Sequence, residues 1–143
     1  AGLPETDRNM GSVANDLRKE GGMAAIAERS LPAIEAQDSD MVLVDGIRGD
    51  AEVRLFREHF PEFFLVGVDA PFATRLSRLS GRMRNDDVQD AEDLIARDSR
   101  EISWGLGRAL ALADTLIMND GSMEEFEEQV RDLLSEIGEE PCE

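Results

Sequence analysis

An aspartate and an arginine stand three residues apart in the segment Asp45-Gly46-Ile47-Arg48-Gly49, directly after the apolar run Met41–Val44. Such a run is typical of a strand buried on both faces of a parallel sheet, and ligands bind beyond the carboxyl ends of such strands. A carboxylate suits a metal ion, a guanidinium suits a phosphate, and glycine lets a ligand approach the backbone. The segment therefore predicts a phosphate-and-metal site. The competing interpretation is a strand-to-helix turn in which Asp45 caps the helix.

Six arginines lie close together in the second half of the chain: Arg75, Arg78, Arg82, Arg84, Arg97 and Arg100. They flank the polar segment 80–90, which suggests a flap that brings guanidinium groups onto a polyphosphate. The competing interpretation is pairing along the helices with acids such as Asp93 and Glu101. We favour the flap, because so many arginines in a very acidic chain require an explanation.

The charge balance of the chain is strongly acidic. It has 32 Asp and Glu against 15 Lys and Arg, a formal net charge of −17, and Lys19 is its only lysine. Acids spread along the whole chain suggest adaptation to molar salt, where screening reduces self-repulsion. A basic partner is the alternative. Non-specific binding of nucleic acid is disfavoured, because a phosphate backbone requires a basic face.

The length and the remaining composition indicate one globular domain. The 143 residues are 41% hydrophobic, enough for a core. No apolar run is long enough to span a membrane and no signal peptide is visible, so we expect a cytoplasmic protein without a membrane partner. Cys142 is the only cysteine, which excludes a disulfide framework within one chain. Trp104 is expected to be buried and structural.

Hydrophobic periodicity predicts helices that alternate with strands. The helices are expected at 10–20, 23–37, 50–60, 72–79, 91–104, 106–112 and 123–137, and the strands at 41–44, 63–68 and 115–118. This order predicts an α/β fold with a mainly parallel sheet covered on both faces. We expect a single domain over residues 1–137 and a frayed acidic tail over 138–143.

Most of the chain resembles the archaeal UPF0200 family of adenylate-kinase-like and dephospho-CoA-kinase-like P-loop proteins. The matching stretches are GLPETDRNMGSVANDLRKEGGMAAIAERSLPAI, VLVDGIRGDAEV, TRLSRLSGRMRNDD and RDSREISWGLGRALALADTLIMNDGSMEEF. The resemblance implies a P-loop-kinase-like three-layer α/β fold with an arginine-rich lid at about 72–104. It also implies a nucleotide or a small phosphate ester as the acceptor, with Mg²⁺ and ATP as cofactors.

The resemblance assigns roles to individual residues. Asp45 would be catalytic and would serve the magnesium shell, while Gly46 and Arg48 would bind the acceptor phosphate. The other implied residues are the catalytic lid arginines Arg78, Arg82 and Arg84, the substrate-binding Arg97 and Arg100, and Asn119 and Gly121 beside the donor's purine ring.

One family hallmark is absent from the sequence. No G-x-x-x-x-G-K-[ST] motif occurs, and Lys19 is not part of a motif of this kind. In the family, that loop follows a first strand that lies between the strands matching 41–44 and 63–68. We therefore expect an incomplete sheet with bare apolar edges, completed by a partner or by self-association into a homo-oligomer. We also expect that the chain by itself transfers no phosphoryl group, because such transfer depends on positioning and charge stabilisation.

Three functions fit the sequence. The first is a part of a nucleotide kinase or ATPase whose phosphate loop precedes Ala1 in the parent gene. The second is a non-catalytic module that binds a nucleotide or a partner. The third is a hydrolase whose metal ion is held by Asp45 and Asp69, and it is the weakest, because no third ligand is in view.

Overall fold

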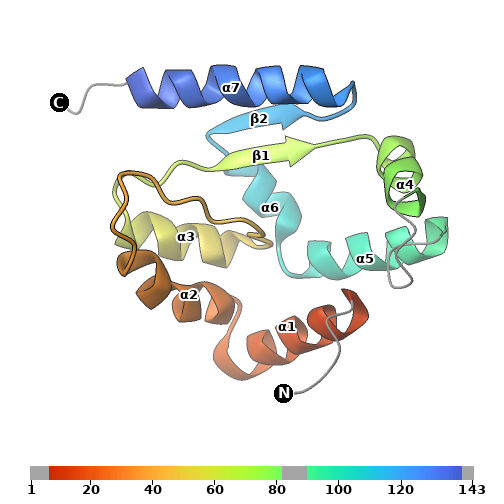
Figure 1. Cartoon of the computed structure of the whole chain (residues 1–143). Coiled ribbons are helices and arrows are strands. Elements are labelled where there is room, and N and C mark those ends of the chain that lie inside the picture. The colour runs from red at the N-terminus through yellow and green to blue at the C-terminus, as the bar shows by residue number, and fades with distance from the viewer. Residues whose placement is uncertain (1–6, 82–89, 140–143) are drawn as a thin grey trace.

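The structure is a computed structural model that describes residues 7–81 and 90–139. Within these ranges it contains seven helices and two strands (Figure 1). In chain order they are α1 (Asp7–Gly21), α2 (Ala25–Glu35), α3 (Asp50–His59), β1 (Val66–Asp69), α4 (Phe72–Ser80), α5 (Ala91–Ser103), α6 (Leu106–Ala111), β2 (Thr115–Met118) and α7 (Met123–Glu139). Most helices lie within two or three residues of the predicted bounds. The end of α1 also follows from the sequence, because Gly22 adopts a left-handed φ of 89° there.

The two strands form a small parallel sheet, as the alternation of helices and strands predicts. Val66 of β1 pairs with Thr115 of β2, and the register runs on to Asp69 and Met118. Helix α7 covers β2 from one side, where Gln129 donates a hydrogen bond to the carbonyl of Met118 at 3.2 Å. Helix α6 lies on the other side (Figure 1). The protein is thus a mixed α/β fold with a short parallel sheet.

The hydrophobic core lies between α3, α6 and the segment that leads into β1. Val53, Leu65 and Ala109 are buried there, and Ile47, Phe63, Leu112 and Ala113 pack against them. Asp114 closes the end of this core, because its Oδ2 accepts a hydrogen bond from the backbone N–H of Leu65 at 2.7 Å. Arg57 of α3 donates to the same carboxylate at 3.0 Å, which ties α3 to the start of β2.

The predicted strand 41–44 is wrong. The backbone is irregular from residue 41 to residue 49, and the side chain of Leu43 is 91% exposed. A strand is stabilised by its ladder with a neighbour, and the described residues offer this segment no such neighbour. The strand predicted at 63–68 does form, but it begins at Val66.

Large apolar side chains remain exposed around the sheet. Leu116 is 58% exposed, and Val68 and Met118 are also exposed. Among the described residues, no strand pairs with the free edge of β1. The apolar face of a parallel sheet is ordinarily covered, so this surface is suited to a partner.

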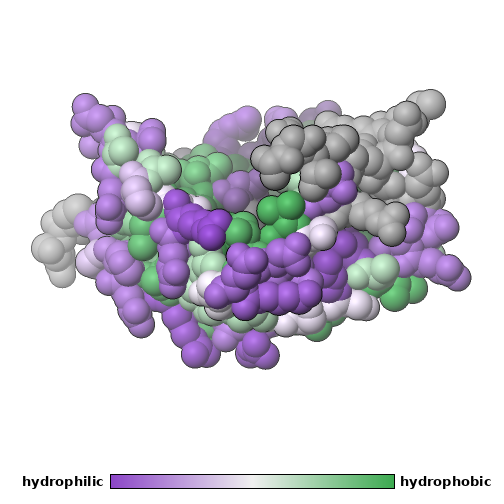
Figure 2. Space-filling view, turned by 90° about the horizontal axis from the view of Figure 1, so that it is seen from below, coloured by the Kyte–Doolittle hydropathy of each residue, from purple (hydrophilic) through white to green (hydrophobic). Residues whose placement is uncertain are grey.

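Hydrophobic side chains also reach other parts of the surface. Figure 2 views the molecule from below and shows hydrophobic groups near the centre of that face, bordered by hydrophilic ones. Met10 of α1 and Ile102 of α5 are more than 60% exposed. In the described part of the chain, no helix has both the length and the apolar character needed to cross a membrane.

Candidate functional site

A buried ion pair lies next to the predicted phosphate segment. Arg18 of α1 and Glu52 of α3 are 2.9 Å apart, and their side chains are only 3% and 4% exposed. The second oxygen of Glu52 accepts a hydrogen bond from the backbone N–H of Arg48 at 2.8 Å. One carboxylate therefore holds α1, α3 and the segment 45–49 together. Glu52 lies in the first turn of α3, where the helix dipole favours an acid.

Trp104 contacts Arg18, the cation of the same pair. The guanidinium of Arg18 stacks 4.3 Å from the centre of its ring, and that of Arg100 lies 5.7 Å from it. Both distances are within the range of a cation–π contact. The indole N–H donates to the side chain of Asn15 at 3.4 Å. Trp104 is 6% exposed, which confirms the expectation that it is buried.

The second glycine of the predicted phosphate segment is required for close packing. A Cβ at Gly49 would collide with the backbone carbonyl of Trp104. Gly105 follows with a left-handed φ of 101°, and a Cβ there would meet the carboxylate of Asp50. The backbones of 49–50 and 104–105 therefore pack directly against each other. This contact fixes the segment 45–49 against the end of α5.

Two of the predicted substrate-binding arginines meet at a single oxygen atom. The Nε of Arg48 lies 3.4 Å from Oε1 of Glu101, and the Nε of Arg97 lies 3.3 Å from the same atom. Arg48 comes from the segment before α3, whereas Arg97 and Glu101 lie one turn apart on α5. The side chain of Arg48 is 36% exposed and that of Glu101 is 14% exposed. The arrangement can hold an anionic oxygen between two guanidinium groups that come from separate elements.

The predicted catalytic Arg78 takes part in a different set of contacts. Its guanidinium donates to the backbone oxygen and the side-chain oxygen of Asn119, each at 2.8 Å, and to the backbone oxygen of Gly121 at 2.7 Å. The structure thus brings Arg78 together with the two predicted nucleotide-binding residues. In this arrangement Arg78 anchors the loop between β2 and α7.

Arg75 joins α4 to α5, the helices that precede and follow residues 82–89 in the sequence. It forms a two-pronged ion pair with Asp98 of α5, with distances of 2.7 Å and 2.8 Å. The hydrogen bonds from Arg75 lower the pKa of the Asp98 carboxyl, and partial burial opposes this effect. The pKa of Arg75 is raised, chiefly by the same hydrogen bonds. The predicted lid arginines Arg82 and Arg84 lie outside the described residues.

Asp45 and Gly46 are exposed on the irregular segment. Gly46 has a φ of 93°, and a Cβ there would meet nothing within 4 Å, so the backbone is open to a ligand. The interpretation of Asp45 as a helix cap is wrong, because Gly49 occupies the N-cap position of α3. Asp69 accepts a hydrogen bond from the N–H of Ala70 at 2.8 Å. In the described residues no group of three or more acids, histidines or cysteines is placed to hold a metal ion.

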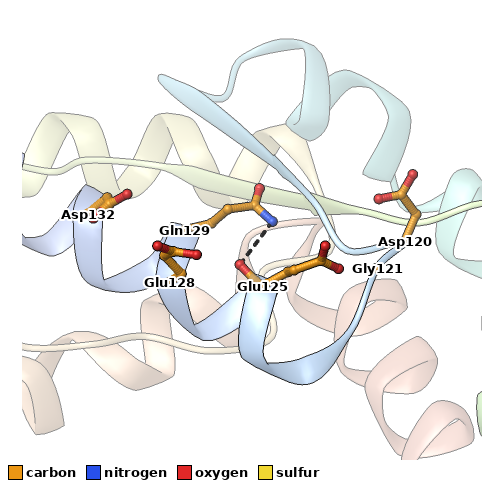
Figure 3. Close-up of a pocket in the computed structure, with 6 residues that line it drawn as sticks. All are labelled: Asp120, Gly121, Glu125, Glu128, Gln129 and Asp132. Atoms are coloured by element: carbon orange, nitrogen blue, oxygen red, sulfur yellow. Dashed lines mark hydrogen bonds between the residues drawn. The ribbon is translucent and has the colours of Figure 1, made fainter.

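A shallow pocket lies between the loop after β2 and α7 (Figure 3). Its lining residues are Asp120, Gly121, Glu125, Glu128, Gln129 and Asp132. Four of these six residues are acids, and carboxylates repel phosphate groups. Arg48 and Arg97, which share one anionic oxygen, lie elsewhere, at the junction of the segment 45–49 with α5.

Two residues of this site, Arg18 and Glu52, are not singled out by the sequence, whereas Glu101 is expected there only as an acid that pairs with the arginines. Arg18 follows Ala14 by one helical turn and Gly11 by two, so it lies on the face of α1 that packs against the fold. An arginine on such a face is a signal for a buried partner. The chain offers 32 acids, however, and their spacing does not identify Glu52 as that partner.

Removal of one member of the buried pair should destabilise the fold strongly. Glu52→Leu leaves a buried guanidinium without its carboxylate, and we expect the free energy of unfolding to fall by about 3–5 kcal/mol. The double variant Arg18→Met/Glu52→Leu should be less destabilised than Glu52→Leu alone. Urea denaturation measures both values. Arg54→Met, which removes a largely exposed cation from α3, should change stability by less than about 1 kcal/mol.

The Asp98–Arg75 pair should make stability depend on pH in the acid range. The pKa of Asp98 is lower in the folded chain than in the unfolded chain, so the pair stabilises the fold above pH 4. This contribution is lost as the pH falls through the folded pKa. Wild type should exceed Asp98→Asn in unfolding free energy at pH 7, by less than about 1 kcal/mol because both side chains are partly exposed. A difference that does not shrink as the pH falls below 4, or that also occurs for Asp132→Asn, would contradict this explanation.

Comparison with known proteins identifies the relatives of the chain. No protein-family model matches it. It is 56% identical to a UPF0200 protein of Methanoregula boonei over 141 residues, which make up 99% of this chain and 78% of that protein. A UPF0200 protein of Methanoculleus marisnigri is 53% identical over 138 residues, 96% of this chain and 75% of the relative. With this identity over nearly its whole length, the chain belongs to the UPF0200 family.

Proposed function

We propose that the chain is a nucleotide-kinase-like domain of the P-loop class that binds the phosphate of a nucleotide or a small phosphate ester. The observation that carries this proposal is the meeting of Arg48 and Arg97 at one anionic oxygen. The resemblance of the segment 45–49 to the acceptor-binding segment of adenylate kinases supports the same assignment.

The physical properties of the site suit a phosphate. Guanidinium groups keep their charge at all physiological pH values, and their N–H donors form strong hydrogen bonds with phosphate oxygens. Arg48 is partly exposed, so a ligand can reach it from solvent. Its backbone is fixed by Glu52, and Gly46 leaves open space beside the segment. A phosphate ester would therefore bind to donors that are already in position.

The two implied cofactors fit the chain differently. Mg²⁺ keeps several waters and takes one or two carboxylates, so the exposed Asp45 fits a magnesium ion that also touches a ligand phosphate. When bound, Mg²⁺ would neutralise phosphate charge there. The residues present do not fit the triphosphate of ATP, because the sequence has no Walker A motif and four acids line the pocket near Gly121. We therefore propose that the chain by itself transfers no phosphoryl group.

The second candidate function is a non-catalytic module that binds a nucleotide or a partner protein. The exposed apolar side chains around β1 and β2 favour it, and so does the free edge of β1, with which no strand in the described part of the chain pairs. A second copy of the chain is one such partner. We further propose that the acidic surface reflects adaptation to molar salt in a cytoplasm. Circular dichroism that is unchanged after dialysis into low salt would contradict this adaptation.

Calorimetric titration in molar KCl tests the proposed function. We expect AMP to bind and Mg-ATP not to bind. Arg48→Ala should weaken AMP binding by about tenfold or more, because it removes a charge-assisted hydrogen bond. Arg54→Ala is the matched control, since it removes an equal charge from the neighbouring helix, and it should leave the affinity unchanged. A failure of AMP to bind would refute the phosphate site, and tight Mg-ATP binding would refute the account of the triphosphate.

A further inference from the structure

We infer that Glu101 is a built-in competitor for the phosphate, because its carboxylate occupies the position between Arg48 and Arg97 that a ligand's phosphate must take. The inference rests on the proposed function and adds a residue that sets the affinity of the site. In this arrangement every ligand displaces Glu101 before it binds both arginines. The cost of this displacement lowers the affinity of the site for every anion by the same factor.

The contacts of Glu101 are those of a substitute ligand. Its Oε1 lies 3.3 Å and 3.4 Å from the two Nε atoms, whereas a well-formed bond between a guanidinium and a carboxylate measures about 2.7–2.9 Å. The distances in the Arg75–Asp98 pair of the same fold are shorter, at 2.7 Å and 2.8 Å. The carboxylate of Glu101 is therefore shared between two donors without an optimal bond to either.

Arg97 and Glu101 form the pairing along the helix that the competing interpretation of the arginine cluster predicts, but this pairing alone does not account for the contact with Arg48. Arg97 precedes Glu101 by four residues, and an intrahelical pair is weaker in that order than with the acid first. Glu101 also faces Arg48, which belongs to another element and whose backbone N–H is held by Glu52. The three side chains of Arg48, Arg97 and Glu101 therefore meet only because the segment 45–49 is held in place. The donors of a ligand site are held in place in the same way.

Displacement of Glu101 is feasible because its side chain is not sealed in the core. The side chain is 14% exposed and has three rotatable bonds, so it can turn towards solvent. The energy lost is that of two partly exposed ion pairs, which are individually weak. The same loss applies to any ligand, whatever is attached to its phosphate.

The experiment compares Glu101→Gln with wild type in calorimetric titrations of AMP and of inorganic phosphate. It is carried out at the lowest salt at which circular dichroism shows all variants folded, because salt screens the effect. We expect Glu101→Gln to bind both probes about threefold to thirtyfold more tightly, and by the same factor for each. Glu127→Gln removes an equal charge from the exposed face of α7 and should leave both affinities unchanged.

The outcomes separate this inference from the proposed function. If wild type binds AMP and Glu101→Gln binds it equally or more weakly, Glu101 only orients the arginines and the inference is wrong, while the proposed function stands. If none of the variants binds either probe, the proposed function itself fails. Should Glu101→Gln not fold, the ¹³C signal of the Glu101 carboxyl in wild type decides. AMP should shift it towards the signal of solvated Glu127, and an unchanged signal would overturn the inference.

Discussion

The ion pair between Arg18 and Glu52 is the contact on which the arrangement of the site depends. Both side chains are nearly inaccessible to water, so each charge requires the other. The pair connects the first helix to the third, and Arg18 also lies over Trp104 at the end of α5. Replacement of such a pair by apolar residues is often neutral or stabilising, so its value here is specificity of position. It places three helices and one irregular segment relative to one another.

That placement explains how a short sheet can support an anion site. The strands β1 and β2 are only four residues long, and the segment 45–49 does not belong to the sheet. Its position comes from Glu52, which holds the N–H of Arg48, and from Gly49, which packs against the carbonyl of Trp104. The guanidinium of Arg48 is thereby directed towards α5. Phosphate binding, as we propose it, uses this direction.

The sequence predicts the helices well, because their apolar residues recur at helical spacing, and it predicts the parallel pairing of the later strands. It fails at residues 41–44, where an apolar run suggests a strand but no strand among the described residues pairs with it. The arginine cluster is only partly anticipated. Arg48 and Arg97 do come together, whereas Arg78 anchors the loop at Asn119. Which of the 32 acids pairs with a given arginine depends on tertiary packing, and hydrophobic periodicity does not predict that packing.

Nuclear magnetic resonance of the arginine side chains shows whether Arg48 and Arg97 bind the phosphate together. The Nε–H signals of Arg48 and Arg97 report on the two donors themselves during a titration with AMP. If the phosphate binds there, both signals shift together with the backbone amide signal of Gly49. The amide signals of Gly121 and Glu125 at the acidic pocket then stay unchanged. Shifts confined to the acidic pocket, or no shift at either arginine at saturating AMP, would contradict the proposal that both arginines bind the phosphate.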